Sequence, residues 1–271
     1  MLGTVRNVFA AGATAFALAF AFPSGWAYSG TPASESASER SPVSEAFARD
    51  GFSVSASRIV FHETRGTAHV VVENRSEKAR LLSAALFTLE PDPVRAGERT
   101  PDFVAAPGLT VLNANRSTPV RIVRVAKDLP RDRESAYVLQ LRLVPEKDPE
   151  RSGETGRVKT VFTTFLKVFY RPAALEAPEA LERAAEKLRW RATGDAIELL
   201  NPTPYWLTVA DLRADGRSLV ADDTRRPVLA PAGGRAVLPA RLTAPPERLT
   251  LSILTDRGTP SEPIELGAKA P

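Results

Sequence analysis

Residues 157–172, RVKTVFTTFLKVFYRP, read as a β-strand that is closed by a proline. Apolar and polar side chains alternate over much of the stretch, and alternation is typical of a half-buried strand. Lys167 stands among apolar residues near the end of this strand, with no acidic residue beside it. Burying an unpaired ammonium group is costly. Lys167 is therefore either a solvated residue of the outer face or a residue that binds an anion supplied by another molecule.

Strand-like segments of the same kind fill residues 51–172. They include FSVSASRIVFHE (52–63) and GTAHVVVENRS (66–76), and polar or proline-bearing turns separate them. About seven short strands at regular spacing are typical of an immunoglobulin-like β-sandwich. The chain has no cysteine, so this sandwich must be stable without a disulfide and no thiol chemistry is available.

A second β domain is predicted after Pro172. Good helix formers at 176–188 indicate one or two helical turns, and strand and turn patterns then return. We predict an all-β fold with two immunoglobulin-like domains, at residues 51–172 and 173–271. At 271 residues with 43% hydrophobic composition, the chain has enough material for two cores.

The N-terminus has the pattern of a secretory signal. Arg6 precedes an apolar run from Val8 to Phe22, and a Pro-Ser-Gly break follows, with GWA ending at Ala27. The run is shorter than the roughly 20 residues that a spanning helix needs. We predict a signal peptide at 1–27, cleaved after Ala27, and the alternative is an uncleaved anchor. Residues 28–50, rich in Ser, Ala and Glu, are predicted to be a disordered linker.

Catalytic motifs are missing from the sequence. It contains no nucleophile elbow, no glycine-rich phosphate loop and no HExxH motif. His62 and His69 are too weak a pair to predict a metal site, and the arginines that flank Asp132 and Glu134 favour ion pairing over acid catalysis. We expect no enzyme activity, no metal and no cofactor. The net charge of +4 is spread along the chain, so no nucleic-acid partner is predicted.

Three motifs resemble one known family. DLPRDRESAYVLQLRLVP (128–145), LKVFYRPAAL (166–175) and LLNPTPYWLTV (199–209) are similar to motifs of the PapD-like periplasmic chaperones of chaperone–usher pilus assembly, in the same order. The resemblance covers roughly residues 52–266. It implies two immunoglobulin-like domains in a boomerang arrangement, with a subunit-binding cleft between them. It also implies that the partners are pilus or fimbrial subunits and an outer-membrane usher.

The resemblance also implies roles for individual residues. Lys167 and Arg58 would bind the C-terminal carboxylate of a subunit, which supplies the anion that Lys167 lacks. Glu134, Arg171 and Asp256 would form an ion network that sets the angle between the domains. Of these three, Asp256 rests on the loosest match.

A donor strand is implied just before Lys167. Counting back in twos from Phe162 gives Phe162, Thr160 and Val158, whose side chains would fill the groove of an incomplete subunit by strand addition. Thr160 departs from the large apolar residue that the family usually has there. Two further departures are Val138, where the family tends to have an aromatic residue, and Gln140, where it tends to have Asn.

The sequence therefore predicts a periplasmic chaperone that caps pilus or fimbrial subunits and delivers them to an usher. An uncovered donor strand would also favour a self-dimer formed by strand pairing. One alternative is a secreted two-domain immunoglobulin-like structural or interaction protein that has lost subunit binding. Another is an exported hydrolase, which the missing catalytic set opposes.

Overall fold

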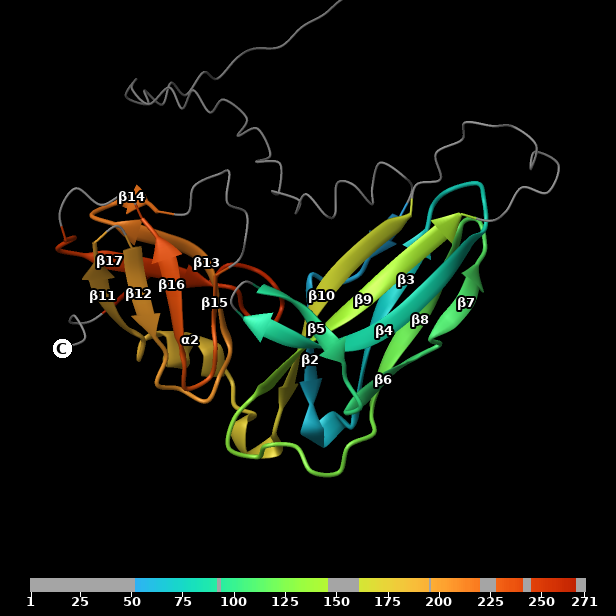
Figure 1. Cartoon of the computed structure of the whole chain (residues 1–271), viewed down its shortest axis with the longest axis horizontal. Helices are drawn as coiled ribbons and strands as arrows, with labels where there is room; N and C mark the ends of the chain where they lie inside the picture. The colour runs from blue at the N-terminus through green and yellow to red at the C-terminus, as the bar shows by residue number, and fades with distance from the viewer. Residues whose placement is uncertain are drawn as a thin grey trace, which may run out of the picture. The chain divides into compact units, whose positions relative to one another are not determined.

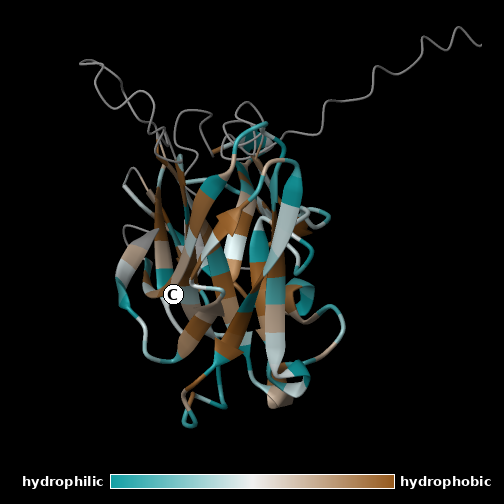
Figure 2. Ribbon diagram, turned by 90° about the vertical axis from the view of Figure 1, so that its right-hand side faces the viewer, coloured by the Kyte–Doolittle hydropathy of each residue, from teal (hydrophilic) through white to brown (hydrophobic). Residues whose placement is uncertain are grey.

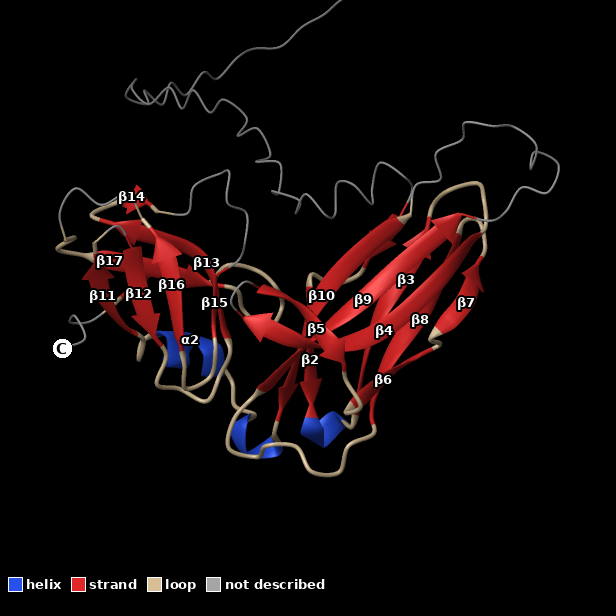
Figure 3. Cartoon of the chain, viewed as in Figure 1, coloured by secondary structure: helices blue, strands red, loops and turns tan. Residues whose placement is uncertain are grey.

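The computed structural model describes residues 52–91, 94–145, 161–194, 196–219, 228–240 and 245–266 (Figure 1). The predicted signal peptide and linker, together with Val158 and Thr160, lie outside these ranges. No helix of the described part is long and apolar enough to cross a membrane. Strands predominate and helix is confined to short segments (Figure 3). The predicted all-β class is confirmed.

Two sheets make up the N-terminal half. The first has the strand order β1 (Phe52–Val54), β3 (Thr67–Asn74), β8 (Arg116–Arg124) and β6 (Phe103–Ala106). The second has the order β2 (Arg58–His62), β10 (Phe162–Arg171), β9 (Ser135–Pro145), β4 (Arg80–Pro91) and β5 (Val94–Arg99), and β7 (Leu109–Leu112) also pairs with β4. Neighbouring strands run antiparallel, except that β10 and β2 are parallel.

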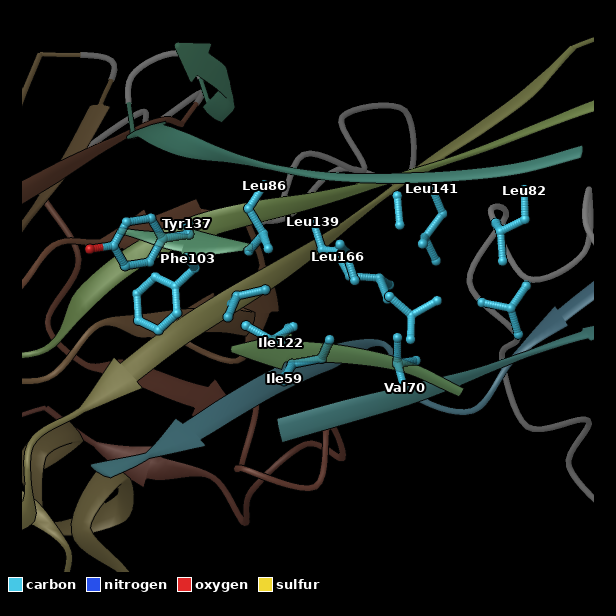
Figure 4. Packing of buried hydrophobic residues seen from close by; sticks show 14 of the residues in the cluster. Ile59, Val70, Leu82, Leu86, Phe103, Ile122, Tyr137, Leu139, Leu141 and Leu166 are labelled. Atoms are coloured by element: carbon cyan, nitrogen blue, oxygen red, sulfur yellow. The ribbon is translucent and has the colours of Figure 1, made fainter. Parts of the chain in front are cut away.

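Alternation along the strands explains the core of this sandwich. In β10, Leu166 and Val168 are buried, whereas Phe165 beside them is 52% exposed, as expected when successive side chains point to opposite faces. Apolar and polar residues alternate along several strands (Figure 2). Buried side chains of the two sheets meet in one cluster, in which Ile122 of the first sheet lies near Leu139 of the second (Figure 4). Burying each such side chain contributes roughly 1.5–3 kcal/mol.

The C-terminal half is a second, smaller sandwich. One sheet has the order β11 (Arg189–Thr193), β12 (Ala196–Leu200) and β16 (Arg235–Pro239). The other has the order β14 (Arg217–Ser218), β13 (Leu207–Ala214), β17 (Leu249–Ile253) and β18 (Ile264–Glu265), and β15 (Val228–Ala230) also pairs with β13. Its own apolar cluster lies between these sheets. Two sandwiches are thus present, as the strand patterns predicted.

The predicted helical turns are present but shorter than the run of helix formers. Helix α2 spans Ala180–Ala185 and buries Leu181 against the C-terminal core. It cannot extend to the beginning of the run, because Glu179 adopts a left-handed conformation with φ of 51°. After Ala185 the chain turns and enters β11 at Arg189.

Each sandwich contains the same buried asparagine arrangement. Asn74 donates its amide hydrogens to the carbonyls of Lys78, Leu112 and Asn113, and Asn201 donates to those of Tyr205, Ala230 and Pro231. The Oδ1 atom of each asparagine accepts hydrogen bonds from the backbone and hydroxyl of the residue two places later. Loop carbonyls that the sheets cannot pair are satisfied in this way.

Two glutamates connect the end of β2 with the segment that joins the halves. The 3-10 turn η1 (Glu63–Arg65) follows β2, and the 3-10 turn η3 (Ala173–Leu175) follows β10 at the beginning of the joining segment. Glu63 accepts a hydrogen bond from the backbone N–H of Ala173 at 3.0 Å, and Glu176 accepts from the backbone N–H of Thr64 at 3.1 Å. The end of β10 is therefore fixed to the end of β2.

Candidate functional site

Arg58 and Lys167 lie side by side on parallel strands. The register of β2 and β10 places Arg58 directly opposite Lys167. Arg58 is only 6% exposed, and Lys167 is half-buried. Parallel pairing of β2 with the second half of β10 thus brings together two cations that are 109 positions apart in the numbering.

The guanidinium of Arg58 has few partners. Its Nη1 donates to the carbonyl oxygens of Leu254 at 2.7 Å and Thr255 at 3.4 Å. Its central carbon lies 4.6 Å from the centroid of the Phe169 ring, within the range of a cation–π contact. The buried Nε atom has no hydrogen-bond partner among the described residues. Arg58 therefore retains unused hydrogen-bond donors.

Lys167 makes no ion pair or hydrogen bond within the described ranges. Burial, together with the smaller effect of the positive charge of Arg58, lowers the pKa of Lys167 to about 8. Burial likewise lowers the pKa of Arg58 to about 10, although Asp256 and Glu134 oppose that shift. Two adjacent cations with so little compensating negative charge can bind an anion, because one carboxylate can pair with both at once.

The structure brings Glu134, Arg171 and Asp256 together. Arg171, 2% exposed, donates from Nε to Glu134 at 2.6 Å and from Nη1 and Nη2 to the two oxygens of Asp256 at 2.6 and 2.8 Å. Burial alone would lower the pKa of Arg171, but the bonds to Asp256 and the charge of Glu134 outweigh it and raise that pKa. Arg171 thus links β9, β10 and the turn after β17.

Trp206 completes this network and was missed by the sequence analysis. Its backbone N–H donates to the carboxylate of Glu134 at 2.8 Å, and its indole N–H donates to the backbone carbonyl of Glu134 at 3.0 Å. A tryptophan inside the PTPYW segment was the available signal. Trp206 also packs against the small buried cluster of Leu89, Val138 and Phe169. The Val138 departure therefore lies in a small apolar cluster.

Of the three predicted donor residues, only Phe162 is described. It opens β10 opposite Leu143 and is partly buried against the N-terminal core. Thr160 and Val158 lie outside the described residues, so the donor strand stays a prediction. Phe165, on the other face of β10, is 52% exposed, and Val161, just before the strand, is 41% exposed; the sequence analysis selected neither.

An exposed apolar patch lies on the outer face of the second sheet. Leu109 and Val111 of β7 are 62% and 59% exposed, and Leu81 of β4, paired with Val111, is 37% exposed. Leu81 also pairs with Val144 of β9. Exposed apolar side chains that lie next to one another are typical of interaction surfaces.

No group of three or more potential metal-binding side chains occurs in the described part of the chain. His62 lies on β2 and His69 on β3, which belong to different sheets. The Nδ1 atom of His62 is 3.7 Å from the carboxylate of Glu176. His62 therefore contacts a residue of the segment that joins the halves.

Family models match both halves of the chain. Residues 51–176 match the N-terminal domain of the pili and flagellar-assembly chaperone PapD, and residues 183–264 match the C-terminal domain of the pili assembly chaperone PapD. Among curated proteins, chaperone protein FimC of Escherichia coli K12 is 30% identical over 173 residues, which cover 64% of this chain and 68% of FimC. The probable fimbrial chaperone ElfD of the same strain is 30% identical over 169 residues, covering 62% and 69% of the two chains.

Solved structures agree in fold. A chain of the complex between the Salmonella enterica SafA pilin and the SafB chaperone matches with a TM-score of 0.66 and 24% identity, covering 80% of this chain and 96% of that one. The Escherichia coli chaperone DraB matches with a TM-score of 0.64 and 22% identity, covering 81% and 96%.

Proposed function

The chain belongs to the PapD family of pili assembly chaperones, and from this premise we propose that it binds pilus or fimbrial subunits in the periplasm by donor-strand complementation. The observation that carries the proposal is the pair Arg58 and Lys167, two adjacent cations that form no ion pair with any acidic residue the structure describes. The C-terminal carboxylate of a subunit supplies the missing charge. Charge-assisted bonds to both cations would anchor the subunit and set the register of its last strand.

The donor strand is the stretch that leads into β10. Val158, Thr160 and Phe162 would present alternate side chains to the groove of an incomplete subunit, and the strand's backbone would pair with the subunit's open edge. Phe162 supports this assignment because its side chain lies at the margin of the core, only partly covered. The small Thr160 would fill its pocket poorly, which suits a complex that a better donor strand later replaces.

The ion network formed by Glu134, Arg171 and Asp256 would fix the angle between the two domains. Arg171 sits on the same strand as Lys167 and binds Asp256 through two of its nitrogens. We assign Glu134, Arg171 and Asp256 to this role and not to subunit contact, because Arg171 is already saturated with carboxylate partners.

Delivery to an outer-membrane usher needs a second surface, because the subunit would occupy the donor strand. The patch formed by the exposed Leu81, Leu109 and Val111 and the half-buried Val144 is suited to this, since it is apolar and separate from Lys167. Residues 1–27 would direct export and 28–50 would act as a linker. The free protein would pair with itself through the donor strand. Its action needs no catalysis and no cofactor.

The alternative, a secreted structural protein that binds no subunits, gives the adjacent cations Arg58 and Lys167 no role. The test is co-purification of partners from the periplasm with wild-type protein, Lys167→Met and a control, Lys127→Met, which changes an exposed lysine. Mass spectrometry should identify a pilus-type subunit with the wild type and the control, but not with Lys167→Met. Equal recovery by all three would contradict the carboxylate anchor. Recovery of no subunit by any of them would contradict the chaperone function.

A further inference from the structure

A tight turn of the C-terminal domain contacts Arg58. The turn spans residues 254–260 and is closed at its base by pairing between Leu254 and Pro260. Inside it, the backbone N–H of Thr255 donates to the carbonyl of Thr259 at 2.8 Å, and that of Gly258 donates to the carbonyl of Thr255 at 2.9 Å. The backbone N–H of Leu254 donates to Thr208 of β13 at 2.8 Å. The turn is therefore rigidly attached to its own sheet.

Backbone carbonyls of this turn hold one end of the Arg58 guanidinium. Nη1 donates to Leu254 and Thr255, whereas Nε makes no hydrogen bond to any described residue. A planar guanidinium that is held at one nitrogen has its orientation restricted. The remaining donors are then presented in a fixed direction, which reduces the entropy lost when an anion binds.

Gly258 permits this close approach. Its φ is +80°, and a Cβ atom built there would lie 2.4 Å from Oγ of Ser57 and 3.9 Å from Cγ of Arg58. A real Cβ atom does not come that close to an oxygen atom, so a side chain at 258 requires either the Ser57 hydroxyl to rotate away or the turn to shift. A branched side chain such as valine adds two further carbons to this contact and favours the shift of the turn, and the carbonyls that hold Arg58 would then move with it.

We propose that the 254–260 turn is part of the anion site, with Gly258 as a positioning residue that lets the Leu254 and Thr255 carbonyls orient Arg58 for a carboxylate. This inference rests on the proposed function and extends it, because it makes the anchor depend on both domains. The same turn carries Asp256, which binds Arg171, so one turn contacts both the anchor and the ion network.

The test compares Gly258→Val with Gly216→Val. Gly216 lies in the same domain with φ of +83° and has open space around a built Cβ. Both variants impose similar backbone strain, but only position 258 contacts Ser57 and Arg58. The probe is a synthetic peptide of alternating valine and threonine with a free C-terminal carboxylate, together with its C-terminal amide. Affinities for both peptides are measured by calorimetry.

Wild type and Gly216→Val should prefer the carboxylate peptide, and Gly258→Val should lose about tenfold of that preference, the worth of one charge-assisted hydrogen bond. Equal preference in all three proteins, or an equal loss in both variants, would overturn the inference. If the valine variant does not fold, Gly258→Ala carries the same clashing Cβ with less bulk.

A second measurement keeps this inference separate from the proposed function. If wild type does not distinguish the two peptides, the carboxylate anchor itself is wrong. The pKa of Lys167, followed by NMR of its Cε, still reports whether the turn holds Arg58, because Arg58 lowers that pKa. It should rise in Gly258→Val and stay unchanged in Gly216→Val. An unchanged value in both would overturn the positioning role.

Discussion

Replacing Arg171 by methionine should be among the most destabilising single changes in this protein. Arg171 is 2% exposed and binds Glu134, whose side chain is 1% exposed. Removing the arginine leaves a buried carboxylate without its charge partner. Breaking a buried ion pair in this way costs about 3–5 kcal/mol of unfolding free energy. By contrast, the carboxylate of Asp256 is 40% exposed, and Asp256→Ala should cost only about 1 kcal/mol.

Urea unfolding followed by tryptophan fluorescence measures both effects, since Trp206 binds Glu134 directly. The double variant Arg171→Met with Glu134→Gln provides the control. Because it also removes the unpaired, buried charge of Glu134, the double variant should be more stable than Arg171→Met alone. If Arg171→Met costs no more than Asp256→Ala, or if the double variant recovers nothing, the unpaired Glu134 charge is not the source of the cost and the reasoning fails.

Three further predictions concern the anchor, the loops and the patch. Affinity for a carboxylate-terminated peptide should fall as pH rises from 7 to 9, because Lys167, with a pKa near 8, loses its charge while Arg58, with a pKa near 10, keeps it; a flat calorimetric profile would exclude Lys167 as the binding group. Asn201→Ala should lower the free energy of unfolding, measured by urea denaturation, by about 3 kcal/mol, because it leaves the carbonyls of Tyr205, Ala230 and Pro231 without this hydrogen-bond donor. A change below 1 kcal/mol would contradict this. Replacing Leu109 and Val111 by threonine should leave subunit co-purification intact but reduce fibre assembly at the cell surface, and normal fibre counts would remove the patch from the usher proposal.

The fold was predictable because burial follows the alternation of side chains. In β10, Leu166 and Val168 are apolar on one parity and face the core, and the pattern alone identifies that face. The short helix was predictable in place but not in length. Its start depends on the backbone conformation of Glu179, for which glutamate carries no signal.

The anchor was predictable only in part. Lys167 attracts attention as a cation among apolar residues, and the motif resemblance pairs it with Arg58. The carbonyl groups of Leu254 and Thr255 could not be found in this way, because every residue has a carbonyl and only the fold brings these two to Arg58. Trp206 binds Glu134 partly through its backbone N–H. This contact could not be predicted from the sequence either, because almost every residue has a backbone N–H.

The most direct test of the central claim is a crystal structure of the protein with a subunit that co-purifies with it. The account predicts that the subunit's terminal carboxylate lies about 3 Å from Nζ of Lys167 and from the guanidinium of Arg58, with the subunit's last strand paired along the strand that leads into β10. A terminal carboxylate bound elsewhere, with Lys167 left in solvent, would contradict it.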